Sequence, residues 1–91
     1  MVIMDKYKQI DLLINVNQLE GERLISRSQA KRLLSKIEPF KSVTLDFANV
    51  VTVGQGFVDE VFRVYLVKNP QTKINYVNAN PDVEFMIRRS M

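Results

Sequence analysis

Three acidic side chains, Asp46, Asp59 and Glu60, have the residue types that could do chemistry in this chain. If a strand end and a helix start bring them together, their oxygens could bind Mg²⁺ or act as an acid–base pair. Alternatively, the two later acids cap the helix and pair with Arg27 or Arg63, the latter one helical turn beyond Asp59. The chain has no histidine and no carboxylate pair of diagnostic spacing, so we expect no catalytic residue, metal or cofactor.

A second candidate is the glycine-flanked glutamine Gly54-Gln55-Gly56, which precedes an apolar helix expected to begin near Phe57. Glycines at a helix start let backbone N–H groups approach a phosphate. However, the chain has no third glycine at Rossmann spacing and no Gly-Lys-Ser/Thr. Asp59 and Glu60 would also place two negative charges in the first helical turn. We therefore interpret the glycines as a tight turn between a strand and a helix.

A third candidate is Ser26-Arg27, at the start of an earlier helix. Ser26 can cap this helix, and Gln29, three residues later, can complete a capping box. If Arg27 reaches the glycine turn, it would form a polar surface with Gln55 and Asn78. A partner or a small ligand could bind such a surface through hydrogen bonds.

The first helix, predicted over residues 26–38, has a basic face opposite its apolar stripe. The face comprises Arg27, Lys31, Arg32 and Lys36. Such a face could contact nucleic-acid phosphates, but no aromatic residue in this helix could stack on bases. We favour a solvated face over a nucleic-acid surface.

The composition indicates one small globular domain. Of 91 residues, 46% are hydrophobic and 25% are charged, and the formal net charge is +3. Cysteine is absent, which excludes disulfides and thiolate zinc sites. No apolar run reaches the roughly 20 residues of a membrane span, and the N-terminus becomes charged too early for a signal peptide. We expect a soluble, cytoplasmic protein.

Apolar periodicity predicts strands that alternate with helices. The predicted strands are 10–16, 43–47 and 73–77, and the predicted helices cover 26–38, begin near 57 and begin at 80–82. This order implies right-handed crossovers and a parallel sheet, with three helices mainly on one face. Met1–Met4 is a candidate for an extra N-terminal edge strand, which would give a small α/β sheet of about four strands.

Several segments together resemble one known family. They are Leu24–Ala30, Leu45-Asp46-Phe47, Gly54–Glu60, Phe62-Arg63 and Asn78-Ala79-Asn80. They resemble the STAS-like domains of unknown function, which are related to the sulfate-transporter and anti-sigma-factor-antagonist fold. The resemblance covers residues 24–90 of a single domain, 1–91, in which 1–23 form an N-terminal strand region.

The resemblance implies a regulatory type of function and does not imply that the protein catalyses a reaction. Anti-sigma-factor antagonists bind an ATPase-type kinase and are switched by phosphorylation of a serine at a helix start. That position falls here at Gln55 or Gly56, which cannot be phosphorylated. The resemblance therefore implies a non-catalytic regulatory module that binds another protein, such as an ATPase or kinase-like regulator. Its implied partner-binding residues are Arg27, Gly54, Gln55, Gly56, Phe57, Asp59, Glu60, Arg63 and Asn78.

Two other functions stay open from the sequence. The first is a Mg²⁺- and nucleotide-binding or hydrolytic domain that uses Asp46, Asp59 and Glu60. The second is a nucleic-acid accessory protein that uses the basic face of helix 26–38. Three aromatic residues without an assured core position, Tyr7, Phe40 and Phe85, could also mark a homodimer or partner surface.

Overall fold

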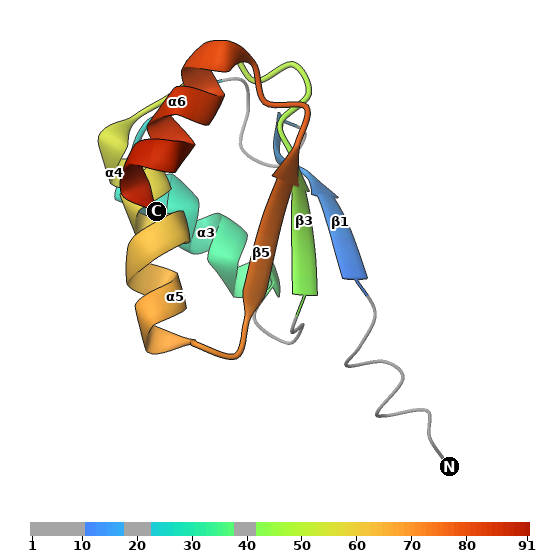
Figure 1. Ribbon diagram of the computed structural model, residues 1–91, viewed down its shortest axis with the longest axis vertical. Helices are drawn as coiled ribbons and strands as arrows, with labels where there is room; N and C mark the ends of the chain where they lie inside the picture. Colours follow the sequence, from blue (N-terminus) through green and yellow to red (C-terminus); the bar gives the residue numbers. More distant parts are fainter. Residues whose placement is uncertain (1–10, 18–22, 38–41) are drawn as a thin grey trace.

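The computed structural model describes residues 11–17, 23–37 and 42–91. Its main sheet is parallel and has three strands, β1 (Asp11–Asn15), β3 (Ser42–Asp46) and β5 (Lys73–Val77), in the order β1-β3-β5 (Figure 1). The register places Asn15, Asp46 and Val77 side by side at the carboxyl edge. The predicted parallel α/β sheet is therefore confirmed. The predicted edge strand Met1–Met4 lies outside the described residues.

A second, two-stranded parallel sheet pairs β2 (Arg23–Leu24) with β4 (Thr52–Val53). The Gly54 N–H extends this pairing by donating to the Leu24 carbonyl oxygen at 2.7 Å. The sequence predicts no strand at Arg23–Leu24, because two residues are too few to show a strand period. This small sheet holds the start of the first helix beside the chain that enters the second.

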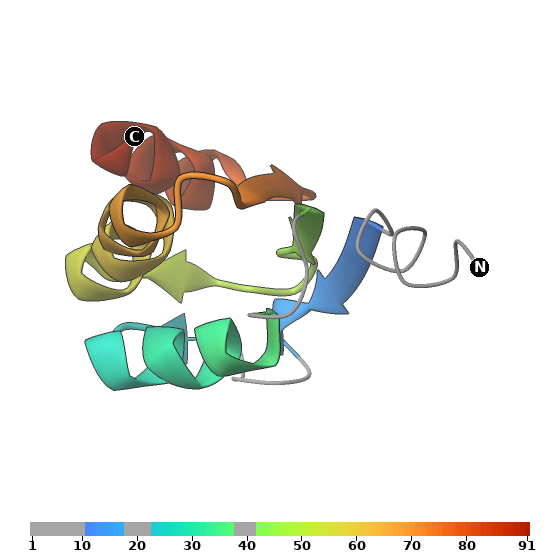
Figure 2. The same cartoon turned by 90° about the horizontal axis from the view of Figure 1, so that it is seen from below.

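Within residues 23–37 and 42–91, the helices lie on one face of the main sheet, as predicted. They are α3 (Arg27–Ile37), α4 (Gln55–Asp59), η1 (Glu60–Val64), α5 (Tyr65–Lys68) and α6 (Pro81–Ser90). The segments α4, η1 and α5 follow one another as a single helical rod, residues 55–68, which we call the central helix. Figure 2 shows the central helix between α3 and α6.

The middle of the central helix, η1, is a π turn. Its wider hydrogen bond runs from the Tyr65 N–H to the Glu60 carbonyl oxygen, five residues back. A single π turn changes the apolar pattern of the helix by only one residue, which is too little for the sequence to reveal, so we expected an ordinary helix. Such turns insert one residue and often lie at functional sites.

The core fills the space between the sheet and the helices. Val43 and Leu45 point into it from β3 and are fully buried, as the strand period requires. Phe57, Val58 and Val61 of the central helix are also fully buried. The central helix is therefore fixed against the sheet along its inner side, and only its outer side can take part in a site.

Side-chain caps fix the starts of α3 and α6, and the cap of α3 was predicted. The Ser26 Oγ accepts from the Gln29 N–H at 3.2 Å, and the Gln29 Oε1 accepts from the Ser26 N–H at 3.0 Å, which is a capping box. The Asn80 Oδ1 accepts from the Val83 N–H at 2.8 Å. Because the capping box sets where α3 begins, it also sets the position of Arg27, the first residue of that helix.

Candidate functional site

Four charged side chains meet where α3 begins and the central helix passes from α4 to η1. Arg27 donates from Nη2 to Asp59 Oδ2 at 3.1 Å and from Nη1 to Glu60 Oε1 at 3.2 Å. Arg63 donates from Nη2 to the same Asp59 oxygen at 2.9 Å and from Nε to the other oxygen. We call these four residues the arginine–carboxylate cluster. The predicted ion pairs of Asp59 with Arg63 and Arg27 are confirmed.

The acids of the cluster lie beneath the arginines. The side chains of Asp59 and Glu60 are 11% and 13% exposed, while those of Arg27 and Arg63 are 50% and 58% exposed. The hydrogen bond from Arg63 lowers the pKa of the Asp59 carboxyl group most. Burial opposes it, and the hydrogen bond from Arg27 and the charges of both arginines lower the pKa further, so the net shift is downward. The cluster therefore presents guanidinium edges to the surface, held in place by a carboxylate that stays ionised.

The acids do not cap the central helix. This helix begins at Gln55, two residues earlier than predicted, so Asp59 lies in its second turn. Its N-cap residue is Gly54, so no N-cap side chain bonds to the first N–H groups of the helix. The prediction that the acids sit in the first turn was wrong, because the apolar face that marked the helix starts later than the helix itself.

The two glycines of Gly54-Gln55-Gly56 have different roles, and neither is a left-handed turn. Gly54 is extended, with φ −101° and ψ 161°. A Cβ atom there would lie 2.8 Å from the Ile25 carbonyl oxygen. The backbones at Ile25 and at residue 54 approach so closely that only a glycine fits at this position. A Cβ atom on Gly56 would lie 3.4 Å from Arg27 Cγ, which is an ordinary contact.

Of two residues predicted to contact a partner, Phe57 is buried and Gln55 is at the surface. Phe57 is fully buried in the core and cannot contact a partner, which corrects that prediction. Gln55 is exposed and donates from Nε2 to the Ser90 Oγ at 3.3 Å, at the end of α6. The adjacency of Phe57 to the glycines in sequence could not reveal that its side chain points inward.

Asn78 and Asp46 lie together, away from the cluster. The Asn78 Nδ2 donates to the Asp46 Oδ1 at 3.0 Å, at the carboxyl edge of the main sheet. Asn78 precedes α6, whereas Gln55 contacts its last residue, Ser90. A helix of this length spans about 15 Å. Asn78 therefore does not join Gln55 and Arg27, contrary to the predicted polar surface.

The three acids proposed as a Mg²⁺ site are likewise divided between two places. Asp46 accepts from the Ala48 N–H at 2.9 Å and from Asn78, whereas Asp59 and Glu60 pair with arginines. In the part of the chain that the structure describes, no group of three potential metal-ligating side chains comes together. The arrangement does not support the proposed three-acid site.

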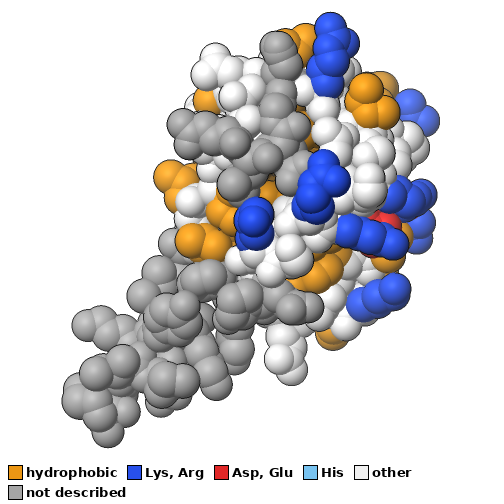
Figure 3. Space-filling model, turned by 180° about the vertical axis from the view of Figure 1, so that it is seen from behind, with side chains coloured by type: hydrophobic (Ala, Val, Ile, Leu, Met, Phe, Trp, Pro, Cys, Tyr) orange, Lys and Arg blue, Asp and Glu red, His pale blue; other side chains and the backbone are white. Residues whose placement is uncertain are grey.

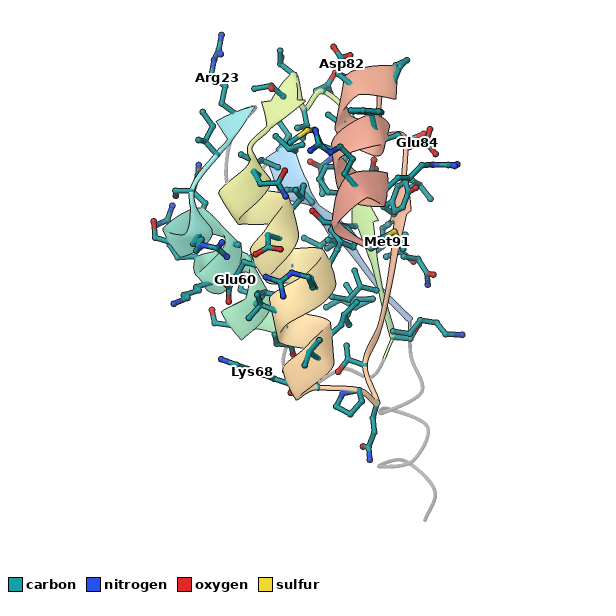
Figure 4. The ribbon with its side chains drawn as sticks, turned by 60° about the vertical axis from the view of Figure 1, so that its left-hand side comes forward. Arg23, Glu60, Lys68, Asp82, Glu84 and Met91 are labelled. Atoms are coloured by element: carbon teal, nitrogen blue, oxygen red, sulfur yellow. The ribbon has the colours of Figure 1, made fainter. Side chains whose placement is uncertain are left out.

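A groove that the sequence did not reveal runs between α3 and the central helix. Its walls include Lys31, Leu34 and Ser35 of α3, and Glu60, Tyr65 and Lys68 of the central helix. In Figure 4, Glu60 lies between the two helices and Lys68 extends toward the α3 side. The groove adjoins the cluster, because Glu60 belongs to both. No sequence signal joins these residues, which only packing of the two helices brings together.

The predicted basic face on α3 is exposed at Lys31, Arg32 and Lys36, while Arg27 is engaged in the cluster. Figure 3 shows Lys and Arg side chains gathered along one side of the molecule, with little acidic surface among them. On α6, Phe85 is exposed as predicted, and the Arg89 guanidinium lies 5.8 Å from its ring centre. Tyr7 and Phe40 lie outside the described residues.

The fold and the site define a small α/β domain with a parallel sheet, helices on one face and an ion-paired corner. A family model described as the STAS-like domain of unknown function (DUF4325) matches residues 29–84, more than half of the chain, and the chain belongs to this family. No curated protein and no solved structure matches it. Within the described residues, no helix is long and apolar enough to cross a membrane.

Proposed function

We propose that this protein is a non-catalytic regulatory module that binds another protein. Its interaction surface is the corner formed by Arg27, the Gly54-Gln55-Gly56 segment and the outer side of the helix through Arg63. The family match supports a regulatory domain of the STAS-like type. The partner class that fits this type is an ATPase or a kinase-like regulator, acting on the module in the cytoplasm.

One observation carries the proposal: the Asp59 carboxylate holds two half-exposed guanidinium groups in fixed positions. Each guanidinium has five N–H donors. The bonds given by the described residues use two donors of Arg27 and two of Arg63. Because both side chains are at least half-exposed, their other donors are available to a partner, and holding the groups in place beforehand reduces the entropy lost on binding. Arginine is also one of the three residue types, with tryptophan and tyrosine, that are enriched among the residues that dominate binding energy at protein interfaces.

The site favours recognition over reaction. Its two acids are engaged by arginines, and Asp59 is kept ionised by them. A general acid or base needs a proton affinity near the working pH and access to substrate. The lowered pKa of Asp59 moves it away from that range. The positions that match the phosphorylated serine of anti-sigma-factor antagonists are Gln55 and Gly56, so we propose regulation that does not require phosphorylation there.

Capture followed by reconstitution tests the proposal. The full chain is immobilised, a protein retained from an extract of the source cells is purified, and its affinity is measured by calorimetry. Arg27→Gln and Arg63→Gln should each weaken binding about tenfold or more, as for a charged contact at an interface. Arg88→Gln is the matched control, because Arg88 is an exposed, ion-paired arginine on α6.

Two results would contradict the proposal. One is a partner that binds the Arg27→Gln and Arg63→Gln variants as tightly as the unaltered chain. The other is turnover of a nucleotide by the purified protein with Mg²⁺, which would favour the enzymatic alternative. Thermal unfolding of each variant must accompany the affinities, because both arginines also stabilise Asp59.

A further inference from the structure

We propose that the groove between α3 and the central helix binds an acidic segment of the partner protein. This inference rests on the proposed function for the existence of a partner, and adds the chemistry of the segment that the partner contributes. The groove lies beside the arginine–carboxylate cluster and shares Glu60 with it. A segment in the groove would therefore extend the same interface.

The charges of the groove favour an anionic occupant. Lys31 and Lys68 lie on opposite walls and both are exposed. Among the described residues, neither ammonium group has a carboxylate within salt-bridge distance. The groove's one acid, Glu60, is already paired with Arg27 at 3.2 Å. The groove thus carries two positive charges that an acidic ligand can match.

The rest of the lining fits a stretch of polypeptide. Leu34 is buried at the base of the groove, and Tyr65 contributes a half-buried aromatic side chain. Asn69 closes one end, where its Nδ2 donates to the Tyr65 carbonyl oxygen at 2.9 Å. An apolar base between two charged rims can hold a segment with one apolar side chain flanked by acids.

A compact phosphate fits the groove less well. The groove runs beside the middle of α3 and the later part of the central helix, where backbone N–H groups are used within the helices. Among the described residues that line it, none lies in the first turn of α3 or of the central helix, so they do not supply the converging backbone donors of a phosphate cradle. Two separate lysines act as point charges, which suits carboxylates spaced along a chain.

The test is a nuclear magnetic resonance titration of the full, isotope-labelled chain. The probe is a capped Glu-Glu-Leu-Glu-Glu peptide, compared with Gln-Gln-Leu-Gln-Gln and with a short DNA duplex. We expect the acidic peptide to shift the amides of residues 31–35 and 60–69. Lys31→Glu and Lys68→Glu should each weaken that binding about tenfold, and Lys36→Glu, the matched control on α3, by about twofold at most.

Three results would overturn the groove proposal. They are equal loss of binding in Lys36→Glu, equal binding of the glutamine peptide, and tighter binding of DNA at the same amides. Partner capture separates the two proposals. If the partner still binds Lys31→Glu and Lys68→Glu but is lost with Arg27→Gln, the groove fails and the proposed function stands. If the acidic peptide binds in the groove while no partner is recovered, the proposed function fails.

Discussion

Arg63 lies one helical turn after Asp59 and donates two hydrogen bonds to its carboxylate. Nε donates to Oδ1 and Nη2 donates to Oδ2. The pair spans the boundary between α4 and the π turn, since Asp59 ends α4 and Arg63 lies within η1. Arg27 adds a bond from α3 to the same carboxylate. One buried acid therefore joins the two helices whose packing forms both the corner and the groove.

Replacement of Asp59 should destabilise the protein more than loss of a surface pair. Asp59→Asn keeps the shape but removes the charge that three hydrogen bonds from two arginines require. Glu84→Gln is the control, because Glu84 pairs with Arg88 at an exposed site where such pairs contribute about 1 kcal/mol at most. Thermal unfolding should show a clearly larger drop in midpoint for Asp59→Asn. Equal drops would mean that the cluster does not hold the helices together.

The same carboxylate gives an acid-dependent stability. Its pKa is lowered in the folded protein from an ordinary value of 3.8, so below that pH the unfolded chain binds more protons. The contribution of Asp59 is therefore complete above about pH 4 and is lost as the pH falls toward the folded pKa. Urea unfolding from about pH 5 to pH 3 should show stability falling with pH. Asp59→Asn should make that fall shallower, and an unchanged slope would rule out Asp59 as its source.

The two glycines give opposite expectations for the same substitution. Gly54→Ala would place a methyl group 2.8 Å from the Ile25 carbonyl oxygen, so the backbone must shift, at a cost of about 1–3 kcal/mol. The methyl group of Gly56→Ala fits beside Arg27 Cγ. Because residue 56 lies within a helix, alanine should raise the free energy of unfolding by about 0.5 kcal/mol or more. Chemical denaturation of both variants measures the difference. A tolerated Gly54→Ala would show that the backbones do not approach so closely.

Asn80 should contribute more to the stability of the protein than a residue that only caps a helix. Its Oδ1 caps α6, while its Nδ2 donates to the carbonyl oxygens of Val50 and Val51 at 3.3 and 3.2 Å. Asn80→Ala should therefore cost more than the typical 1 kcal/mol or so of a lost cap. Asn80→Ser keeps a capping oxygen and should recover only part of the loss. Full recovery by serine in urea unfolding would show that the Nδ2 bonds contribute nothing.

Much of the fold could be predicted because its elements have strong local signals. The capping box at Ser26 and Gln29 and the Asn80-Pro81 start mark two helices by side-chain chemistry alone, and both caps are present. The apolar residues Val43 and Leu45 alternate with polar ones, and this pattern predicted the central strand. That strand is present and pairs in parallel, as predicted. These features depend on residues within a few positions of one another.

The features that could not be predicted depend on contacts between distant segments. The pairing of Leu24 with Val53 involves two residues on each side, too few for a pattern. The reason for Gly54 lies in Ile25, which is far away in the sequence. Phe57 and Asn78 were assigned to the partner surface by proximity to a motif, but side-chain direction and helix length place them elsewhere. The Asp59–Arg63 pair was predictable because its spacing is local.

The most direct test of the account is the affinity of the purified partner for the double variant Arg27→Gln/Arg63→Gln, measured by calorimetry beside Arg88→Gln. The account predicts a loss well beyond tenfold for the double variant, because it removes both exposed guanidinium groups while Asp59 remains. Arg88→Gln should bind as the unaltered chain does. Unchanged affinity of the folded double variant would contradict the claim that this corner is the partner's binding site.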